Sequence, residues 1–167
     1  MKIEFLGNNH TNLIGQNQLL DLLENKYIDY DLWLEFLYPN DIKLIKSINE
    51  FNREEILKEI LENLSKNNKW SIGYNKNLID IIKKALKYNI NIFPLERKKY
   101  SLHNFVKTYG VNGMFYYIND RISDQENGCN DRWIKMVKNN QKITRKNQII
   151  FAGNLHKAPL EKLLNSN

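Results

Sequence analysis

The sequence predicts an α/β fold in which helices cover both faces of a mostly parallel central sheet of at least four strands. Short runs of β-forming residues alternate with longer segments whose apolar residues recur at helical spacing, a pattern typical of parallel α/β sheets. No stretch rich in Pro, Gly or Ser divides the chain, and 167 residues suffice for one domain with a hydrophobic core. We therefore expect residues 1–167 to form a single α/β domain.

Two strands are expected in the first half of the chain. Residues 2–6 form a short apolar run. A second run over residues 31–37 is bounded by turn signals at residues 30–31 and 39–40 and is expected to end as a strand near Glu35. The remaining segments carry leucine and isoleucine at the helical period. Pro39 opens one of these segments, and Glu54 lies early in the next, where a carboxylate favours the helix dipole. Helices are expected over residues 14–27, 39–48 and 53–65.

The second half continues the alternation. Residues 77–87 have helical periodicity, and residues 89–93 alternate into a strand that Pro94 stops. The aromatic-rich stretch from 100 to 117 is interrupted by Gly110 and Gly113, which predicts a helix or two with a loop. The order is completed by a helix over 130–139, a strand over 148–152 and a terminal helix over 159–164.

The composition excludes several classes of protein. The single cysteine, Cys129, excludes an internal disulfide framework and a multi-cysteine zinc site. The formal charge is +6, but the densest basic pieces, residues 97–99 and 142–146, are short and match no nucleic-acid motif, so nucleic acid is an unlikely partner. Neither a secretory signal nor a transmembrane stretch is visible. We expect a cytoplasmic protein, or one exported without a cleavable signal; the sequence leaves the oligomeric state open.

The pattern Gly-x-x-His occurs twice, at opposite ends of the chain. Gly7 to His10 follows the first predicted strand, and Gly153 to His156 follows the last one. Ligands of α/β sheets bind outside the carboxyl ends of the strands, and glycine permits a turn that a Cβ would obstruct. If the two strands are neighbours, both imidazoles reach one crevice.

An acidic residue is expected at the same edge. Glu35 lies in an otherwise apolar strand, where a carboxylate is costly unless it is paired, hydrogen-bonded or bound to a metal. His10, Glu35 and His156 match the three-ligand sites of catalytic divalent metals such as Mn, Zn, Co or Fe. Without a metal, they would make a histidine general base oriented by a carboxylate. Glu96 also follows a predicted strand, but basic residues come directly after it, and we interpret it as part of a solvated turn.

Arg121 and Arg132 are the candidate cations. Arg132 lies in the helix that leads into the last strand, where an arginine would hold an anionic group or polarise a carbonyl. The alternative is a surface arginine paired with Asp131 or Asp120. The sequence leaves the choice between Arg121 and Arg132 open.

These residues together resemble a superfamily that unites erythromycin-esterase-like hydrolases, Tiki and TraB-type metalloproteases, ChaN-like haem-uptake proteins and a domain of certain bacterial toxins. Its members share two Gly-x-x-His motifs, a Glu that ends the second strand and an Arg in the helix before the last strand. The matching residues here are His10, Glu35, His156 and either Arg132 or Arg121. The chain departs from the pattern at Asn8 and Asn9, because members often carry Glu inside the first motif.

The resemblance implies a hydrolase that acts on an ester, amide or peptide bond of a small-molecule or peptide substrate, with or without a divalent metal. One alternative is a non-catalytic module that binds a ligand such as haem, with aromatic residues between Phe105 and Tyr117 lining an apolar pocket. Another is a bacterial effector or toxin domain of the same fold.

Overall fold

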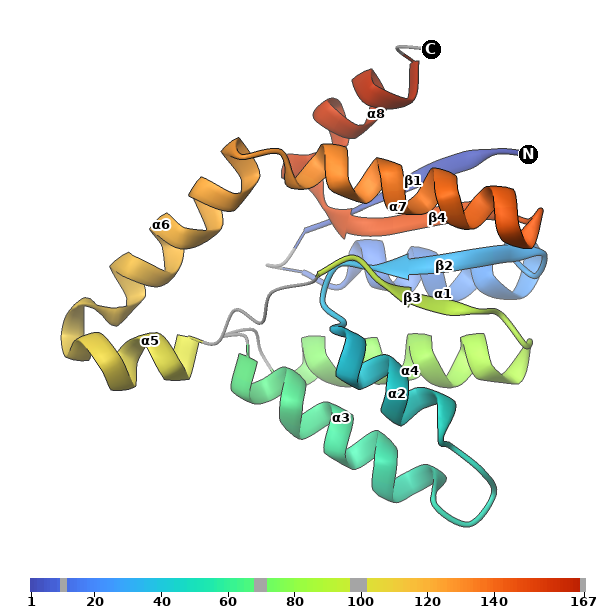
Figure 1. Cartoon of the computed structure of the whole chain (residues 1–167). Coiled ribbons are helices and arrows are strands. Elements are labelled where there is room, and N and C mark those ends of the chain that lie inside the picture. Colours follow the sequence, from blue (N-terminus) through green and yellow to red (C-terminus); the bar gives the residue numbers. More distant parts are fainter. Residues whose placement is uncertain (10–11, 68–71, 97–101, 166–167) are drawn as a thin grey trace.

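The computed structural model describes residues 1–9, 12–67, 72–96 and 102–165. It has an α/β fold whose four strands form one all-parallel sheet in the order β1-β4-β2-β3. The strands are β1 (Ile3–Asn8), β2 (Tyr30–Leu34), β3 (Ile92–Pro94) and β4 (Asn147–Gly153). The predicted fold class is therefore confirmed, and all four described strands run in the same direction (Figure 1).

Helices connect the strands, and most begin within a few residues of their predicted positions. They are α1 (Ile14–Asn25), α2 (Pro39–Lys46), α3 (Arg53–Asn67), α4 (Ile72–Lys87), α5 (Leu102–Tyr109), α6 (Gly113–Glu126), α7 (Cys129–Thr144) and α8 (Lys157–Asn165). Two short 3-10 helices, η1 (Gly110–Asn112) and η2 (Asn154–His156), follow α5 and β4.

The strands bury side chains on both faces of the sheet, since successive side chains point to opposite sides. Leu32 of β2 and Phe151 of β4 belong to a core shared with α1, α2, α3 and α4. Trp33 and Ile150, the alternate residues of the same strands, belong to a second core shared with α7 and α8. The helices therefore cover both faces, as predicted, and the sheet lies between the two cores.

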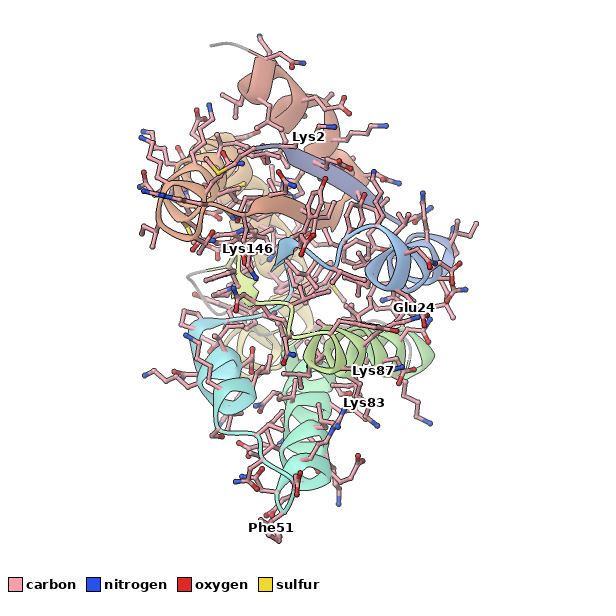
Figure 2. The ribbon with its side chains drawn as sticks, turned by 90° about the vertical axis from the view of Figure 1, so that its right-hand side faces the viewer. Lys2, Glu24, Phe51, Lys83, Lys87 and Lys146 are labelled. Carbon is pink, nitrogen blue, oxygen red and sulfur yellow. The ribbon has the colours of Figure 1, made fainter. Side chains whose placement is uncertain are left out.

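Asp31 contradicts the turn that the sequence predicts at residues 30 and 31. It lies inside β2 and is completely buried. Its Oδ2 accepts hydrogen bonds from Asn140 Nδ2 at 2.9 Å, Thr144 Oγ1 at 2.7 Å and Gln148 Nε2 at 3.0 Å. These bonds compensate for burying the carboxylate and tie β2 to α7 and β4. Figure 2 views this end of the molecule, where Lys2 and Lys146 lie next to the first residues of β1 and β4.

The α5–α6 hairpin, residues 102–126, extends away from the sheet on the side of the carboxyl edge (Figure 1). The expected break at Gly110 is confirmed by η1, but Gly113 begins a helix instead of ending one. A Cβ on Gly113 would lie 2.4 Å from the Cα of Val106, so glycine is what lets the two helices pack this closely. Among the described residues, no helix combines the length and the apolar character that crossing a membrane requires.

Candidate functional site

A buried ion-pair cluster lies at the carboxyl edge of the sheet. The guanidinium of Arg121 bridges two carboxylates, with Nη2 3.1 Å from Glu35 Oε1 and Nη1 3.0 Å from Glu96 Oε1. The Glu35 and Glu96 residues are only 2% and 4% exposed, whereas the Arg121 side chain is 29% exposed. We call Glu35, Arg121 and Glu96 the carboxylate–guanidinium cluster. Arg121 is its contact with solvent.

The parallel register of the sheet places the two glutamates together. Glu35 directly follows β2 and Glu96 comes two residues after β3, and the last residues of these strands, Leu34 and Pro94, are paired. The Leu95 N–H donates to the Leu34 carbonyl at 3.1 Å, which extends the pairing beyond the strands. The solvated turn predicted for Glu96 is therefore wrong. The basic residues that follow Glu96 in the sequence indicate an exposed turn. The backbone pairing of the two strand ends nevertheless places Glu96 itself in the interior.

His156 lies beside Glu35, and two residues of α7 contact its imidazole ring. Its Nδ1 is 2.8 Å from Asn130 Oδ1, and its Nε2 is 3.6 Å from Glu35 Oε1. The Trp133 ring packs on the imidazole with 4.5 Å between the ring centroids. Because both Asn130 and Trp133 belong to α7, this helix sets the orientation of the ring. Sequence reasoning missed Asn130 as a partner of His156, since only the packing of α7 on β4 brings the two together.

The second glycine motif also fixes Glu35 directly. The backbone N–H of Gly153 donates to Glu35 Oε2 at 2.6 Å, while Oε1 faces Arg121 and His156. This bond joins the end of β4 to the end of β2, its neighbour in the sheet. The motif therefore supplies both an imidazole and a backbone donor to the same carboxylate.

The first glycine motif lies on a neighbouring strand, as its predicted role requires. Gly7 pairs with Ala152 and Asn8 with Gly153 in the β1–β4 register. A Cβ on Gly7 would lie 1.9 Å from the Asn154 side chain, so glycine makes room here instead of permitting a left-handed turn. His10 lies outside the described residues. The joint position of the two imidazoles stays a prediction.

Asn8 is the buried polar residue that the described part of the first motif contributes. Its side-chain amide donates to the hydroxyl of Tyr74 on α4, and it is only 1% exposed. Burial raises the pKa of Tyr74, and the nearby negative charge of Glu35 raises it further. A neutral, buried amide and phenol therefore lie at the carboxyl end of β1.

The structure separates the two candidate arginines. Arg121 belongs to the carboxylate–guanidinium cluster, whereas Arg132 Nη2 pairs with Asp124 at 2.8 Å, and the Arg132 side chain is 37% exposed. The Arg132 pair therefore has the surface character that the alternative interpretation expected, although its partner is Asp124 instead of Asp131 or Asp120. Of the two, Arg121 is the one placed against the predicted acid Glu35.

Burial raises the pKa of three acidic side chains near this edge. It raises the pKa of Glu96 to about 7, against the attraction of Arg121 and with a further contribution from the charge of Glu35. Burial also raises the pKa of Tyr117, on the same helix as Arg121. It raises the pKa of Cys129 to about 12, which keeps the thiol protonated at neutral pH. Glu96 is thus poised to exchange a proton near neutral pH.

The donor set does not fit a divalent metal among the described residues. Both oxygens of Glu35 and one of Glu96 already face N–H donors, and the positive charge between the carboxylates is that of Arg121. In the described ranges, no group of three or more His, Cys, Asp or Glu side chains has metal-binding geometry. The predicted ligand set of His10, Glu35 and His156 includes a residue outside those ranges, and it stays a prediction.

The aromatic residues expected to line a haem pocket lie on the α5–α6 hairpin. Phe105 contacts Tyr109 and Tyr117, and Tyr109 lies 4.5 Å from Tyr116 between ring centroids. Tyr109, Phe115 and Tyr116 are each more than two-fifths exposed. The rings therefore contact one another, and three of them are exposed to solvent. The haem expectation stays a prediction.

Comparisons of the chain with protein-family models, curated proteins and solved structures found no match. The superfamily resemblance thus rests on the motif residues alone. The function is argued below from the geometry of the site.

Proposed function

We propose that the protein is a hydrolase that cleaves an ester, amide or peptide bond by acid–base chemistry at the carboxyl edge of its sheet. The observation that carries this proposal is the buried Glu35–Arg121–Glu96 cluster with His156 beside it. The cluster combines a fixed cation, a carboxyl group that titrates near neutrality and an oriented imidazole. Acyl transfer uses this combination to stabilise an oxyanion and to move protons.

Arg121 is proposed to stabilise the oxyanion. Two buried carboxylates hold its guanidinium from two sides, so little reorganisation is needed when negative charge develops on a substrate carbonyl. The Arg121 side chain is 29% exposed. A substrate carbonyl oxygen can therefore approach the guanidinium from the solvent side.

Glu96 and His156 are proposed to transfer the protons: one takes a proton from the water that attacks the carbonyl carbon, and the other gives a proton to the oxygen or nitrogen that leaves. With a pKa of about 7, Glu96 is present in both protonation states at neutral pH, as general acid–base catalysis requires. Because Asn130 Oδ1 accepts a hydrogen bond, His156 Nδ1 carries its proton and Nε2 is the nitrogen left for proton exchange. Glu35 is a positioning residue, since its two oxygens accept hydrogen bonds from the Gly153 N–H and from Arg121 Nη2.

The metal-assisted form of this reaction depends on His10. The proposed mechanism uses no metal, because Arg121 occupies the place between the carboxylates that a cation would take. A small-molecule or peptide substrate, action in the cytoplasm, and action as an exported effector all remain proposals. They are compatible with a chain whose described helices are unsuited to crossing a membrane.

The test is turnover of a panel of fluorogenic esters, amides and peptides by wild type, Arg121→Ala and Arg132→Ala. Removing an oxyanion donor costs about 100-fold to 1,000-fold in kcat, whereas Arg132 pairs with Asp124 at the surface and its loss should cost less than about threefold. Arg121→Lys, which keeps the positive charge against both carboxylates, controls for unfolding. A panel that the wild type does not cleave, or equal activity of Arg121→Ala and Arg132→Ala, would refute the proposal.

A further inference from the structure

Tyr117 lies one helical turn before Arg121 on α6. Residues four positions apart share one face of a helix, and their side chains lean towards its amino end. The Arg121 side chain therefore leans towards the turn that carries Tyr117. Because Arg121 contacts Glu35 and Glu96, this face of α6 is the one turned towards the carboxyl edge of the sheet. The Tyr117 phenol thus stands next to the carboxylate–guanidinium cluster.

The charges of this cluster act on the Tyr117 phenol. Burial makes the largest contribution to its raised pKa, the guanidinium of Arg121 opposes the rise, and the carboxylates of Glu96 and Glu35 add to it. All three members therefore lie close enough to the phenol to affect its ionisation. A phenol whose pKa is raised above 10 keeps its proton at neutral pH, so Tyr117 presents an O–H donor.

The ring of Tyr117 is fixed, but its hydroxyl has no acceptor within the described part of the chain. The ring packs edge-on against Phe105 with 5.8 Å between the centroids and 81° between the ring planes. No described side chain or backbone group hydrogen-bonds to the hydroxyl. By contrast, the hydroxyl of Tyr74 is buried and accepts a hydrogen bond from Asn8. Tyr117 is only partly buried, so an acceptor can come from outside the protein.

The proposed reaction creates an acceptor for such a donor. When the oxygen of a water molecule bonds to the substrate carbonyl carbon, the electron pair of the C=O π bond moves to the carbonyl oxygen, which becomes an oxyanion. That pair forms the carbonyl again when the bond to the leaving oxygen or nitrogen breaks. Side chains that donate hydrogen bonds to this oxygen, tyrosine among them, stabilise the transition state when they are already oriented.

We propose that Tyr117 is a second catalytic residue on α6, whose hydroxyl donates a hydrogen bond to the same oxyanion as Arg121. This role rests on the proposed hydrolysis. Tyr117 keeps its proton throughout, and the protons that move are those that Glu96 and His156 transfer. Because both oxyanion donors belong to one helix, the helix itself fixes their spacing.

Steady-state kinetics of Tyr117→Phe and Tyr116→Phe test this role. Each variant removes one phenolic oxygen from α6 and keeps the ring, so the contacts of Tyr117 with Phe105 and of Tyr116 with Tyr109 remain. Tyr116 is the matched control, since it is 45% exposed and lies on the neighbouring position of the helix. Both variants should keep the circular dichroism and Tm of the wild type. The substrate is an ester, amide or peptide of the fluorogenic panel that the wild type cleaves, and the inhibitor is a phosphonate with the same acyl substituent, whose tetrahedral anion mimics the intermediate.

Tyr117→Phe should lower kcat about 10-fold to 100-fold, because a hydrogen bond to a charged acceptor is lost. KM should stay within about threefold, and the inhibition constant of the phosphonate should rise by a factor similar to the loss in kcat, because the bond forms only when the oxyanion does. Tyr116→Phe should change each value less than about twofold.

If the wild type cleaves the substrate and Tyr117→Phe keeps its kcat, loses activity through KM alone or loses no more than Tyr116→Phe, the role of Tyr117 is overturned while the proposed hydrolysis stands. A wild type that cleaves nothing in the panel would refute the hydrolysis itself and this role with it.

Discussion

Replacing Glu96 by glutamine should remove a pH-dependent loss of stability from the protein. In the folded chain Glu96 is buried and shares Arg121 with Glu35, and its pKa is raised from 4.5 to about 7. At about 1.4 kcal/mol for each unit of pKa, this rise corresponds to about 3 kcal/mol. Glutamine keeps an acceptor oxygen for Arg121 but cannot ionise.

The direction of this pH dependence follows from the number of protons that each state binds. Between pH 4.5 and about 7, the folded state holds the Glu96 proton and the unfolded state has released it, so the contribution of this group to stability is lost as the pH rises. The stability of Glu96→Gln relative to wild type should therefore be more favourable at pH 8 than at pH 5. The expected difference is about 2 to 3 kcal/mol.

Urea unfolding followed by tryptophan fluorescence at pH 5 and pH 8 measures this difference. Glu126→Gln, at an exposed position of α6, is the matched control and should show the pH dependence of the wild type. If the stability of Glu96→Gln relative to wild type were the same at both pH values within about 0.5 kcal/mol, the conclusion that burial raises the pKa of Glu96 would be wrong.

Three further predictions concern the site and the hairpin. Arg121→Met should lower the free energy of unfolding by about 3 kcal/mol at pH 8 and by less at pH 5, because it removes the cation between two buried carboxyl groups. The control Arg132→Met should lower it by less than about 1 kcal/mol in the same urea titrations. Gly113→Ala should destabilise the hairpin by about 1 to 3 kcal/mol, since its Cβ would meet Val106 backbone, and unchanged amide exchange over residues 105–120 would contradict this. Elemental analysis of dialysed protein should find no stoichiometric divalent metal; a metal present in the wild type and lost in His10→Ala/His156→Ala would restore the three-ligand prediction.

The sequence predicted the elements whose patterns are local. Helical periodicity identified α1 and α3, and short apolar runs identified β1 and β4, because a segment that packs one or both faces against a core must carry apolar residues at the matching period. The parallel sheet followed from the alternation of these segments. Errors occurred where a polar residue normally indicates a turn, as at Asp31, which long-range hydrogen bonds compensate inside β2.

By itself, the sequence determined the fold class and singled out Glu35, His156 and two arginines as candidates, since a glutamate in an apolar strand and a histidine after a strand-end glycine are unusual in any fold. Only the tertiary structure decided that Arg121 faces Glu35, that Glu96 joins them and that Asn130 holds His156. These contacts join residues 25 or more positions apart. The order and register of the strands and the packing of α6 and α7 on their ends create them, and no local pattern in the chain encodes that geometry.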